Sequence, residues 1–251
     1  MPSYHVIPER VIVCRRREDG TDEKQTFAPS GERGAPTALI VTAIALILAT
    51  VVMVLLAGRQ AWGAEPPREA MKYQRELIRS ARAVWGMNAP IAVFGAQIHQ
   101  ESSWRPDARS AYAGGLAQFT PATADWIGST YRTELGLSDP FNPSWAMRAL
   151  VRYDRHLFDR IEAATPCDRW AFVLAAYNGG NGWISRDRAL AMRNGADPDR
   201  WWGHVELYSP RAEWAFRENR RYPRRILLVL QPRYLRWGAG VACEQAIGVV
   251  E

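Results

Sequence analysis

An uncharged apolar run is the feature that most limits how this chain can fold. From Thr37 to Ala57 there is no Asp, Glu, Lys or Arg, and most residues are Ala, Val, Ile or Leu. A helix rises about 1.5 Å per residue, so this run would span roughly 31 Å, the thickness of a hydrocarbon core. A buried helix in a soluble domain rarely reaches this length without a polar face. The run therefore predicts one transmembrane helix at residues 37–58.

A cleaved signal peptide is the alternative interpretation of the same run. The 36 residues before it make a long leader, and Ala61 to Ala64 has no good small-x-small cleavage site. An uncleaved membrane anchor is therefore favoured. The positive-inside rule does not set its orientation, because basic residues lie close to both ends. These are Lys24 and Arg33 before the run and Arg59, Arg68 and Lys72 after it.

The composition differs between the two sides of the run. Residues 1–36 are polar and contain few aromatic residues, so we expect a disordered tail. Residues 59–70 form a linker that includes Gly63 to Pro67, and residues 71–251 suffice for one domain with its own core. The chain has a net charge of +6, from 32 basic and 26 acidic residues. All of it lies after the run, because the tail balances Arg10, Arg15, Arg16, Arg17, Lys24 and Arg33 against Glu9, Glu18, Asp19, Asp22, Glu23 and Glu32.

Apolar residues after the linker recur at helical spacing. Pro90 is placed to start a helix whose apolar stripe contains Phe94 and Ile98. The segments from Trp145 to Ile161 and from Trp170 to Tyr177 are further helix candidates, and runs that alternate with a period of two are scarce. We therefore expect a mostly α domain.

Glu101 occupies the next position on the stripe of Phe94 and Ile98. A carboxyl group there would point toward the interior of the domain. Partial burial raises the pKa of a carboxyl group, which suits a general acid at neutral pH. A glutamate near a helix end is more often solvated, so this position alone does not establish a catalytic site.

Short motifs surround and follow Glu101. Ser110 lies nine positions after it, and Gly115-Leu116-Ala117-Gln118 comes next. Later segments are Ala175-Ala176-Tyr177-Asn178-Gly179-Gly180 and Glu218-Asn219-Arg220-Arg221-Tyr222. Together they resemble the glutamate–serine, Gly-Leu-Met-Gln, Ala-Tyr-Asn-Ala-Gly and Glu-Thr-x-x-Tyr signatures of the soluble lytic transglycosylases, relatives of goose-type lysozyme. The departures are Ala117, Gly179 and Asn219, in place of the family's Met, Ala and Thr.

This resemblance covers about residues 91–226 and implies a fold and a reaction. The fold would be mostly α, in the lysozyme-like α+β superfamily, as a helical catalytic domain preceded by one transmembrane helix. The reaction would cleave the β-1,4 bond between N-acetylmuramic acid and N-acetylglucosamine in peptidoglycan and leave a 1,6-anhydro product. Ordinary glycosidases use two carboxylates. This family is similar to the substrate-assisted enzymes and uses one glutamate, here Glu101, first as acid and then as base. No metal or other cofactor is implied.

The resemblance also assigns five substrate-binding positions. Ser110 would orient the substrate, with Gln118 in the groove. Tyr177 matches the family tyrosine that hydrogen-bonds near the glutamate, and Asn178 lies beside it. Tyr222 matches the late tyrosine at the cleavage site. From the residues alone, Asn178 could instead serve a helix C-cap and Tyr222 could be a core side chain.

Cys167 and Cys243 are the only cysteines after the apolar run. If the domain lies outside the cytoplasm, an even pair in an oxidising compartment predicts a disulfide, which would close a loop of about 75 residues. We expect a single-pass protein of the inner membrane with an extracytoplasmic catalytic domain, whose partners are the membrane and the glycan strands of peptidoglycan. Such anchored forms occur in bacterial envelope machines and in phage lysis proteins, and phage lysis is our first expectation.

The sequence leaves three other functions open. Clustered arginines suggest nucleic-acid binding, but Tyr222 and the apolar stretch Ile226 to Leu230 interrupt them, so we expect no nucleic-acid partner. A wall-binding protein without turnover would not require Glu101. A goose-type lysozyme on the same fold would hydrolyse the same bond to a reducing sugar. The arginines are Arg217, Arg220, Arg221, Arg224, Arg225, Arg233 and Arg236.

Overall fold

The computed structural model describes residues 65–243 and three short segments near the N-terminus, 6–7, 10–16 and 22–27. They belong to two compact units, Met1–Ala61 and Trp62–Glu251. The predicted transmembrane helix at residues 37–58 lies outside the described residues. Within the described residues, no helix is both long enough and apolar enough to cross a membrane.

The first unit contains a small antiparallel sheet. Its strands β1 (Val6–Ile7), β2 (Arg10–Arg16) and β3 (Asp22–Phe27) are ordered β1-β2-β3. The register of β2 and β3 runs from Val11↔Phe27 to Arg16↔Asp22. These strands lie within residues 1–36, for which the sequence predicted a disordered tail. β-Branched residues such as those of β2 favour extended chain, a local preference that the overall polarity of the tail did not reveal.

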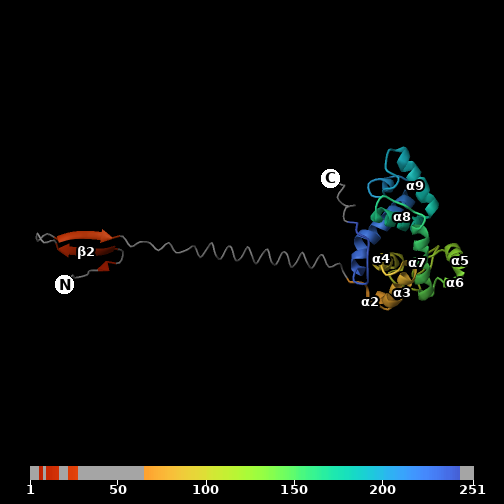
Figure 1. Cartoon of the computed structure of the whole chain (residues 1–251), viewed down its shortest axis with the longest axis horizontal. Helices are drawn as coiled ribbons and strands as arrows, with labels where there is room; N and C mark the ends of the chain where they lie inside the picture. The colour runs from red at the N-terminus through yellow and green to blue at the C-terminus, as the bar shows by residue number, and fades with distance from the viewer. Residues whose placement is uncertain (1–5, 8–9, 17–21, 28–64, 244–251) are drawn as a thin grey trace. The chain divides into compact units, whose positions relative to one another are not determined.

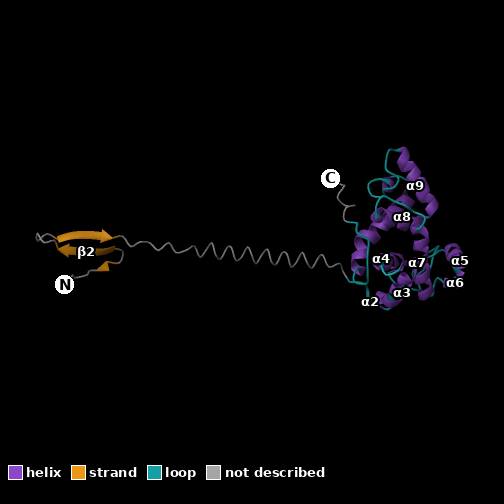
Figure 2. Cartoon of the chain, in the orientation of Figure 1, coloured by secondary structure: helices purple, strands orange, loops and turns teal. Residues whose placement is uncertain are grey.

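The second unit is built from helices joined by loops, which confirms the prediction of a mostly α domain (Figures 1 and 2). Among residues 65–243 the β pairing consists of two isolated bridges, Arg109↔Gly114 and Gly114↔Phe119. The helices are α2 (Arg68–Met71), α3 (Gln74–Trp85), α4 (Ile91–Ser102), α5 (Pro121–Thr130), α6 (Arg132–Leu135), α7 (Pro143–Phe158), α8 (Pro166–Gly179), α9 (Asn181–Arg193) and α10 (Glu213–Arg224). Shorter turns are η1 (Val205–Leu207), η2 (Arg225–Leu230) and η3 (Gln231–Tyr234).

Three helices begin with the same local pattern, a capping side chain followed by proline. The side chains of Thr120, Asn142 and Thr165 each accept a hydrogen bond from the backbone N–H three residues later, at 3.2, 3.2 and 3.1 Å. The proline that follows has no N–H to leave unpaired, and its fixed φ suits the first helical turn. This pattern sets the starts of α5, α7 and α8.

Helix α4 lies at the centre of the second unit (Figure 1). Every residue from Ile91 to Ile98 is buried, and α3, η2 and η3 pack against the helix. Gly95 permits the close approach of η3, because a Cβ there would lie 2.7 Å from Cδ1 of Tyr234. The helix ends where Ser103 and Trp104 adopt positive φ angles of 51° and 66°. These residues turn the chain away just after Glu101 and Ser102.

Helix α8 is the second buried helix, and it contacts α7, α9 and α10. Beyond Pro223 the C-terminal helix continues as the π-helical turn η2, which is consistent with the missing N–H of proline. Cys167 at the start of α8 and Cys243 are joined by a disulfide with an S–S distance of 2.05 Å and a Cα–Cα distance of 5.3 Å. The end of the described chain is thereby fixed to the helix that carries Tyr177.

Candidate active site

Glu101 lies in the last turn of α4, partly buried, and meets α10. The hydroxyl of buried Tyr222 donates a hydrogen bond to Glu101 Oε1. These two residues are 121 positions apart in the sequence. The structure therefore brings together the first and last motifs that the sequence singled out.

Tyr177 on α8 completes this group. Its ring stacks on that of Tyr222, with a centroid distance of 6.4 Å and an interplanar angle of 9°. Its hydroxyl donates to the carbonyl oxygen of Ala117 at 2.7 Å. Tyr177 thus links the Gly-Leu-Ala-Gln turn to the site through the backbone, a contact that the replacement of Met by Ala at position 117 leaves possible.

The environment of Glu101 favours its protonated form. Burial raises the pKa of the Glu101 carboxyl group to about 8, the negative charge of Glu218 adds to the rise, and the hydrogen bond from Tyr222 opposes it. Burial also raises the pKa of Tyr222 and of Tyr177 well above the usual range, so both keep their hydroxyl protons. At neutral pH the site therefore holds one protonated carboxyl group beside two phenols.

The loop between α4 and α5 is held in shape by its own polar groups. Gln118 Nε2 donates to the carbonyl oxygens of Ala108 at 3.1 Å and Gly115 at 2.9 Å. Gly115 has a φ of +78°, and a Cβ at this position would lie 1.7 Å from the carbonyl oxygen of Pro140. Only glycine therefore fits this turn.

Ser110 is exposed in the same loop, and its hydroxyl accepts the N–H of Ala113 at 3.0 Å. Among the described residues, neither Ser110 nor Gln118 forms a hydrogen bond with Glu101. The structure brings together Glu101, Tyr177 and Tyr222, and it places Ser110 and Gln118 in the adjoining loop.

Asn178 contacts α10 rather than Glu101. Its Oδ1 accepts a hydrogen bond from Asn219 Nδ2 at 3.0 Å, and Asn219 Nδ2 also donates to the carbonyl oxygen of Ala175 at 2.8 Å. A Cβ on Gly179 would lie 2.7 Å from Asn219 Nδ2 and 2.3 Å from Arg211 Nη1. Two of the three departures from the family motifs are thus linked, because Asn219 occupies space that Gly179 leaves free.

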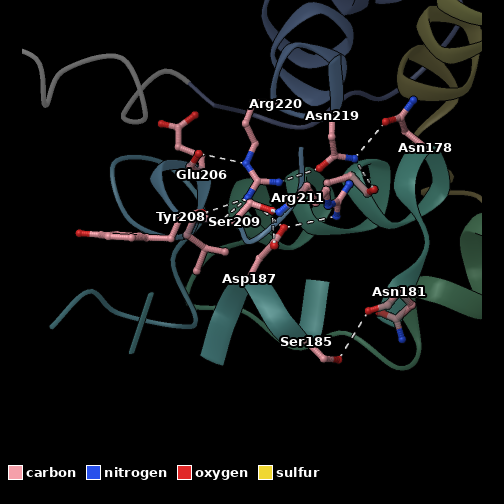
Figure 3. A network of polar contacts seen from close by, with 12 residues as sticks. Asn178, Asn181, Ser185, Asp187, Glu206, Tyr208, Ser209, Arg211, Asn219 and Arg220 are labelled. Carbon is pink, nitrogen blue, oxygen red and sulfur yellow. Dashed lines mark hydrogen bonds and ion pairs between the residues drawn. The ribbon is translucent and has the colours of Figure 1, made fainter. Parts of the chain in front are cut away.

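Figure 3 shows the polar network in which Asn219 takes part. Asp187 on α9 is completely buried and accepts hydrogen bonds from Ser209 Oγ at 2.7 Å, Arg211 Nη2 at 3.3 Å and Arg220 Nη2 at 2.9 Å. Arg220 Nη1 in turn donates to Asn219 Oδ1 at 2.7 Å. Arg220 precedes Tyr222 by two residues, so the network fixes the part of α10 that presents Tyr222 to Glu101.

Sequence reasoning missed two buried polar residues next to this site, Gln97 and Asp154. Both are completely buried, and Gln97 Nε2 donates to Asp154 Oδ1 at 3.4 Å. Burial raises the pKa of Asp154 well above its usual range, the hydrogen bond from Gln97 opposes this, and the charge of Glu101 adds to it. The position of Asp154 in the sequence could have indicated that it is buried, because it falls on the apolar stripe of α7 between Leu150 and Leu157.

A pocket of about 330 Å³ lies near the site and is lined in part by Tyr153. The Tyr153 ring lies 5.4 Å from that of Tyr177 and also lines the pocket, whereas Glu101 does not. Trp126, 41% exposed, forms part of its wall. The remaining lining residues are Ala122, Thr123, His156, Leu157, Arg160 and Asn181.

The chain is similar in sequence to known proteins. Residues 78–199 match the family described as the transglycosylase SLT domain. The membrane-bound lytic murein transglycosylase F of Aeromonas salmonicida is 34% identical over 135 residues, which cover 52% of this chain and 24% of that protein. The protein of the same name from Maricaulis maris is 35% identical over 132 residues, which cover 52% of this chain and 27% of that protein. The chain thus spans about a quarter of the length of these relatives.

Two solved structures share the fold. The 70 kDa soluble lytic transglycosylase from Escherichia coli has a TM-score of 0.50 at 22% identity, with 66% of this chain and 24% of that chain covered. An inactive mutant of lytic transglycosylase Slt from Pseudomonas aeruginosa has a TM-score of 0.51 at 20% identity, with 70% and 26% covered. Residues 78–199 thus match the transglycosylase SLT domain family, and the two solved structures have a similar fold.

Proposed function

We propose that this protein is a peptidoglycan lytic transglycosylase that cleaves the β-1,4 bond between N-acetylmuramic acid and N-acetylglucosamine. The observation that carries this proposal is the position of Glu101, a carboxyl group with a pKa of about 8 held by Tyr222 inside a transglycosylase SLT domain. A protonated carboxyl group at neutral pH can donate a proton to a leaving oxygen. The relatives named lytic murein transglycosylase support the substrate class.

Glu101 would act twice in the reaction. Its proton passes to the glycosidic oxygen, the bond from that oxygen to C1 of the muramoyl residue breaks, and the N-acetylglucosamine end leaves as an alcohol. The Glu101 carboxylate then takes the proton of the muramoyl 6-hydroxyl, whose oxygen bonds to C1. The 1,6-anhydro ring closes and Glu101 regains its proton. No water is consumed, so a second carboxylate to activate water is unnecessary.

The surrounding residues have separate roles in this proposal. Tyr222 orients Glu101 through its hydrogen bond, and Tyr177 positions the Ala117 turn. Gln118 braces the loop that presents Ser110 to the substrate. Asn178 supports α10 through its hydrogen bond with Asn219, and it has no role in binding the sugar in this proposal.

The pocket that Tyr153 lines would receive sugar rings further along the same glycan strand. The partly exposed ring of Trp126 is a surface on which the apolar face of a sugar can pack. Arg160 and Asn181, which also line the pocket, have side chains that can donate hydrogen bonds. Such a groove would bind the strand over several sugars and bring one bond to Glu101.

The anchor and the location of the domain also belong to this proposal. The apolar run at residues 37–58 would hold the protein in the inner membrane with the SLT domain on the extracytoplasmic side, where peptidoglycan lies. The disulfide between Cys167 and Cys243 suits such an oxidising compartment. The names of the relatives describe those proteins as membrane-bound. Phage lysis, as opposed to a bacterial envelope machine, stays a prediction from the sequence.

Digestion of purified peptidoglycan by residues 62–251, followed by mass spectrometry of the soluble products, tests this function. We expect muropeptides with 1,6-anhydro ends. Reducing ends would instead identify a hydrolytic, goose-type lysozyme activity on the same fold. Binding without any product would indicate a wall-binding protein, and digestion by Glu101→Gln at the wild-type rate would contradict the assignment of the acid.

A further inference from the structure

Gln97 and Asp154 form a buried polar pair one helical turn below Glu101. Gln97 lies four residues before Glu101 on α4, so the two side chains share a helix face. Asp154 reaches Gln97 from α7 and accepts its Nε2–H at 3.4 Å. Neither side chain is exposed to solvent. The proposed reaction does not use either residue.

Each member of the pair leaves one oxygen unpaired. Within the described residues, Gln97 Oε1 and Asp154 Oδ2 are buried and have no hydrogen-bond partner. The N–H donors of the Gln97 amide are on Nε2, and its Oε1 can only accept a hydrogen bond. If Asp154 were ionised, both Gln97 Oε1 and Asp154 Oδ2 would be acceptors without a donor. Buried polar groups without a partner are strongly unfavourable.

The groups around Asp154 offer no positive charge. Glu101 on α4, Tyr153 on α7, Tyr177 on α8 and Tyr222 on α10 are the titratable groups that interact with it. Each is neutral or negative, and no ion pair to Asp154 occurs among the described residues. An ionised Asp154 would therefore be a buried charge without compensation.

A proton on Asp154 Oδ2 would give the unpaired oxygens a hydrogen bond and would remove the uncompensated buried charge. We propose that Asp154 is a neutral carboxylic acid in the working enzyme, with its Oδ2–H donating to Gln97 Oε1 while Gln97 Nε2–H donates to Asp154 Oδ1. The two hydrogen bonds form a closed acid–amide ring that ties α7 to α4 directly below Glu101. Asp154 is then a positioning residue, whose role rests on the proposed function of Glu101.

A neutral pair matters because Glu101 must change its charge during the reaction. A second negative charge below it would favour the protonated form of Glu101 and hinder its conversion to a base. The acid–amide ring supplies rigidity without that charge. Burial raises the pKa of Asp154 well above its usual range, which agrees with a retained proton.

Asp154→Asn is the decisive variant, because an asparagine can form the same ring with Gln97 as a protonated aspartate. We expect its activity on peptidoglycan to stay within about twofold of wild type, and the alkaline limit of kcat to stay in place. Asp154→Ala leaves Gln97 without its partner, and we expect a loss of tenfold or more in kcat. A downward shift of the alkaline limit in Asp154→Asn would show that Asp154 is ionised in the wild type and would overturn the proposal.

Two measurements on residues 62–251 require no turnover, so they separate this inference from the proposed function. Infrared difference spectra at neutral pH, wild type minus Asp154→Asn, should show the carbonyl band of a protonated carboxyl group. The exposed Asp159→Asn is the matched control and should remove no such band. If wild type fails to cleave peptidoglycan but this band is present, the proposed function fails and the protonation state stands.

The pH dependence of unfolding gives the second measurement. A folded state that holds one extra proton loses stability as pH rises above the pKa of unfolded aspartate, about 4. The unfolding equilibrium constant of wild type, relative to Asp154→Asn, should therefore rise about tenfold per pH unit from there toward neutrality. A constant ratio over this range would contradict a protonated Asp154, as would the absence of the infrared band.

Discussion

Two completely buried aspartates in this domain are held in opposite ways. Asp187 receives a hydroxyl and two guanidinium groups, from Ser209, Arg211 and Arg220 (Figure 3). Asp154 receives one amide hydrogen, from Gln97, and faces Glu101 and three tyrosines. The two side chains are chemically identical and equally buried. Asp187 forms ion pairs with two arginines, whereas Asp154 forms none among the described residues.

The difference separates the supporting structure from the reactive part of the site. The Asp187 network uses opposite charges to fix α10, which carries Tyr222. In the described part of the chain, no ion pair is formed by Glu101 or Asp154, and burial raises the pKa of both carboxyl groups, which favours their protonated forms. Strong pairing would stabilise the fold but would also ionise the acid that the reaction needs. Substitutions in the two regions can break this contrast.

Replacing Glu101 by glutamine should have the largest effect. Glutamine cannot donate or accept the transferred proton, so we expect a fall of about 10⁴-fold in kcat. Release of anhydromuropeptides from purified peptidoglycan measures it. Circular dichroism should show an unchanged fold.

The same variant should be more stable than wild type under alkaline conditions. Folded Glu101 has a pKa of about 8, above the unfolded value of about 4.3. Its contribution to stability is therefore complete below pH 4 and declines as pH rises toward 8. Urea unfolding at pH 5 and pH 8 measures the difference. An equal stability gap at both values would argue against a buried, protonated Glu101.

Removing the charge of Asp187 should have the largest effect on stability. Asp187→Asn leaves the guanidinium groups of Arg211 and Arg220 buried without a counter-charge. We expect the free energy of unfolding to fall by about 3–5 kcal/mol. Urea denaturation measures the loss. A change below 1 kcal/mol would mean that the network does not hold α10 in place.

The hydroxyl of Tyr222 should shift the alkaline limit of activity, which the pKa of Glu101 sets. The first step needs protonated Glu101, so wild-type activity should fall about tenfold per pH unit above pH 8. The hydrogen bond from Tyr222 favours the charged form, so Tyr222→Phe should move this limit to higher pH while lowering kcat about tenfold through lost orientation. Tyr177→Phe is the control, because its hydroxyl bonds Ala117 and should leave the limit in place.

An exposed ion pair gives the smallest expected effect. Arg155 and Asp159 pair at 2.9 Å on the surface of α7, with side chains 39% and 46% exposed. Solvent screens this pair, so Asp159→Asn should cost about 0.3–0.5 kcal/mol of unfolding free energy and leave activity unchanged. A cost comparable to that of Asp187→Asn would remove the contrast between buried and exposed pairing.

Local sequence patterns predicted the helices and the centre of the site. The stripe of Phe94 and Ile98 correctly predicted α4, and motif spacing correctly grouped Glu101 with Tyr177 and Tyr222. Both predictions rest on local sequence patterns. Helical periodicity is visible over a few residues, and each motif is a short segment of the chain.

The partners of buried charges could not be predicted in this way. Asp187 and Arg220 are 33 positions apart, and no local sequence pattern indicates that they form a pair. Both Asp154 and Asp187 do occupy positions on the buried face of a helix, a sign that a polar partner must exist. Which partner it is depends on tertiary packing. The β2–β3 pairing near the N-terminus was likewise missed, because overall polarity outweighed the local preference of β-branched residues.

The disulfide has a consequence for proteolysis. It closes residues 167–243 into a covalent ring that contains Tyr177 and Tyr222, whereas Glu101 lies outside the ring. A protease that cuts once in the exposed segment 192–195, at the end of α9, would release no fragment, because both halves stay joined through the disulfide. The nicked protein would run as one band on a gel until a reductant separates the pieces. Among extracellular proteases, such a ring would let the site survive a cut that would divide an unlinked chain.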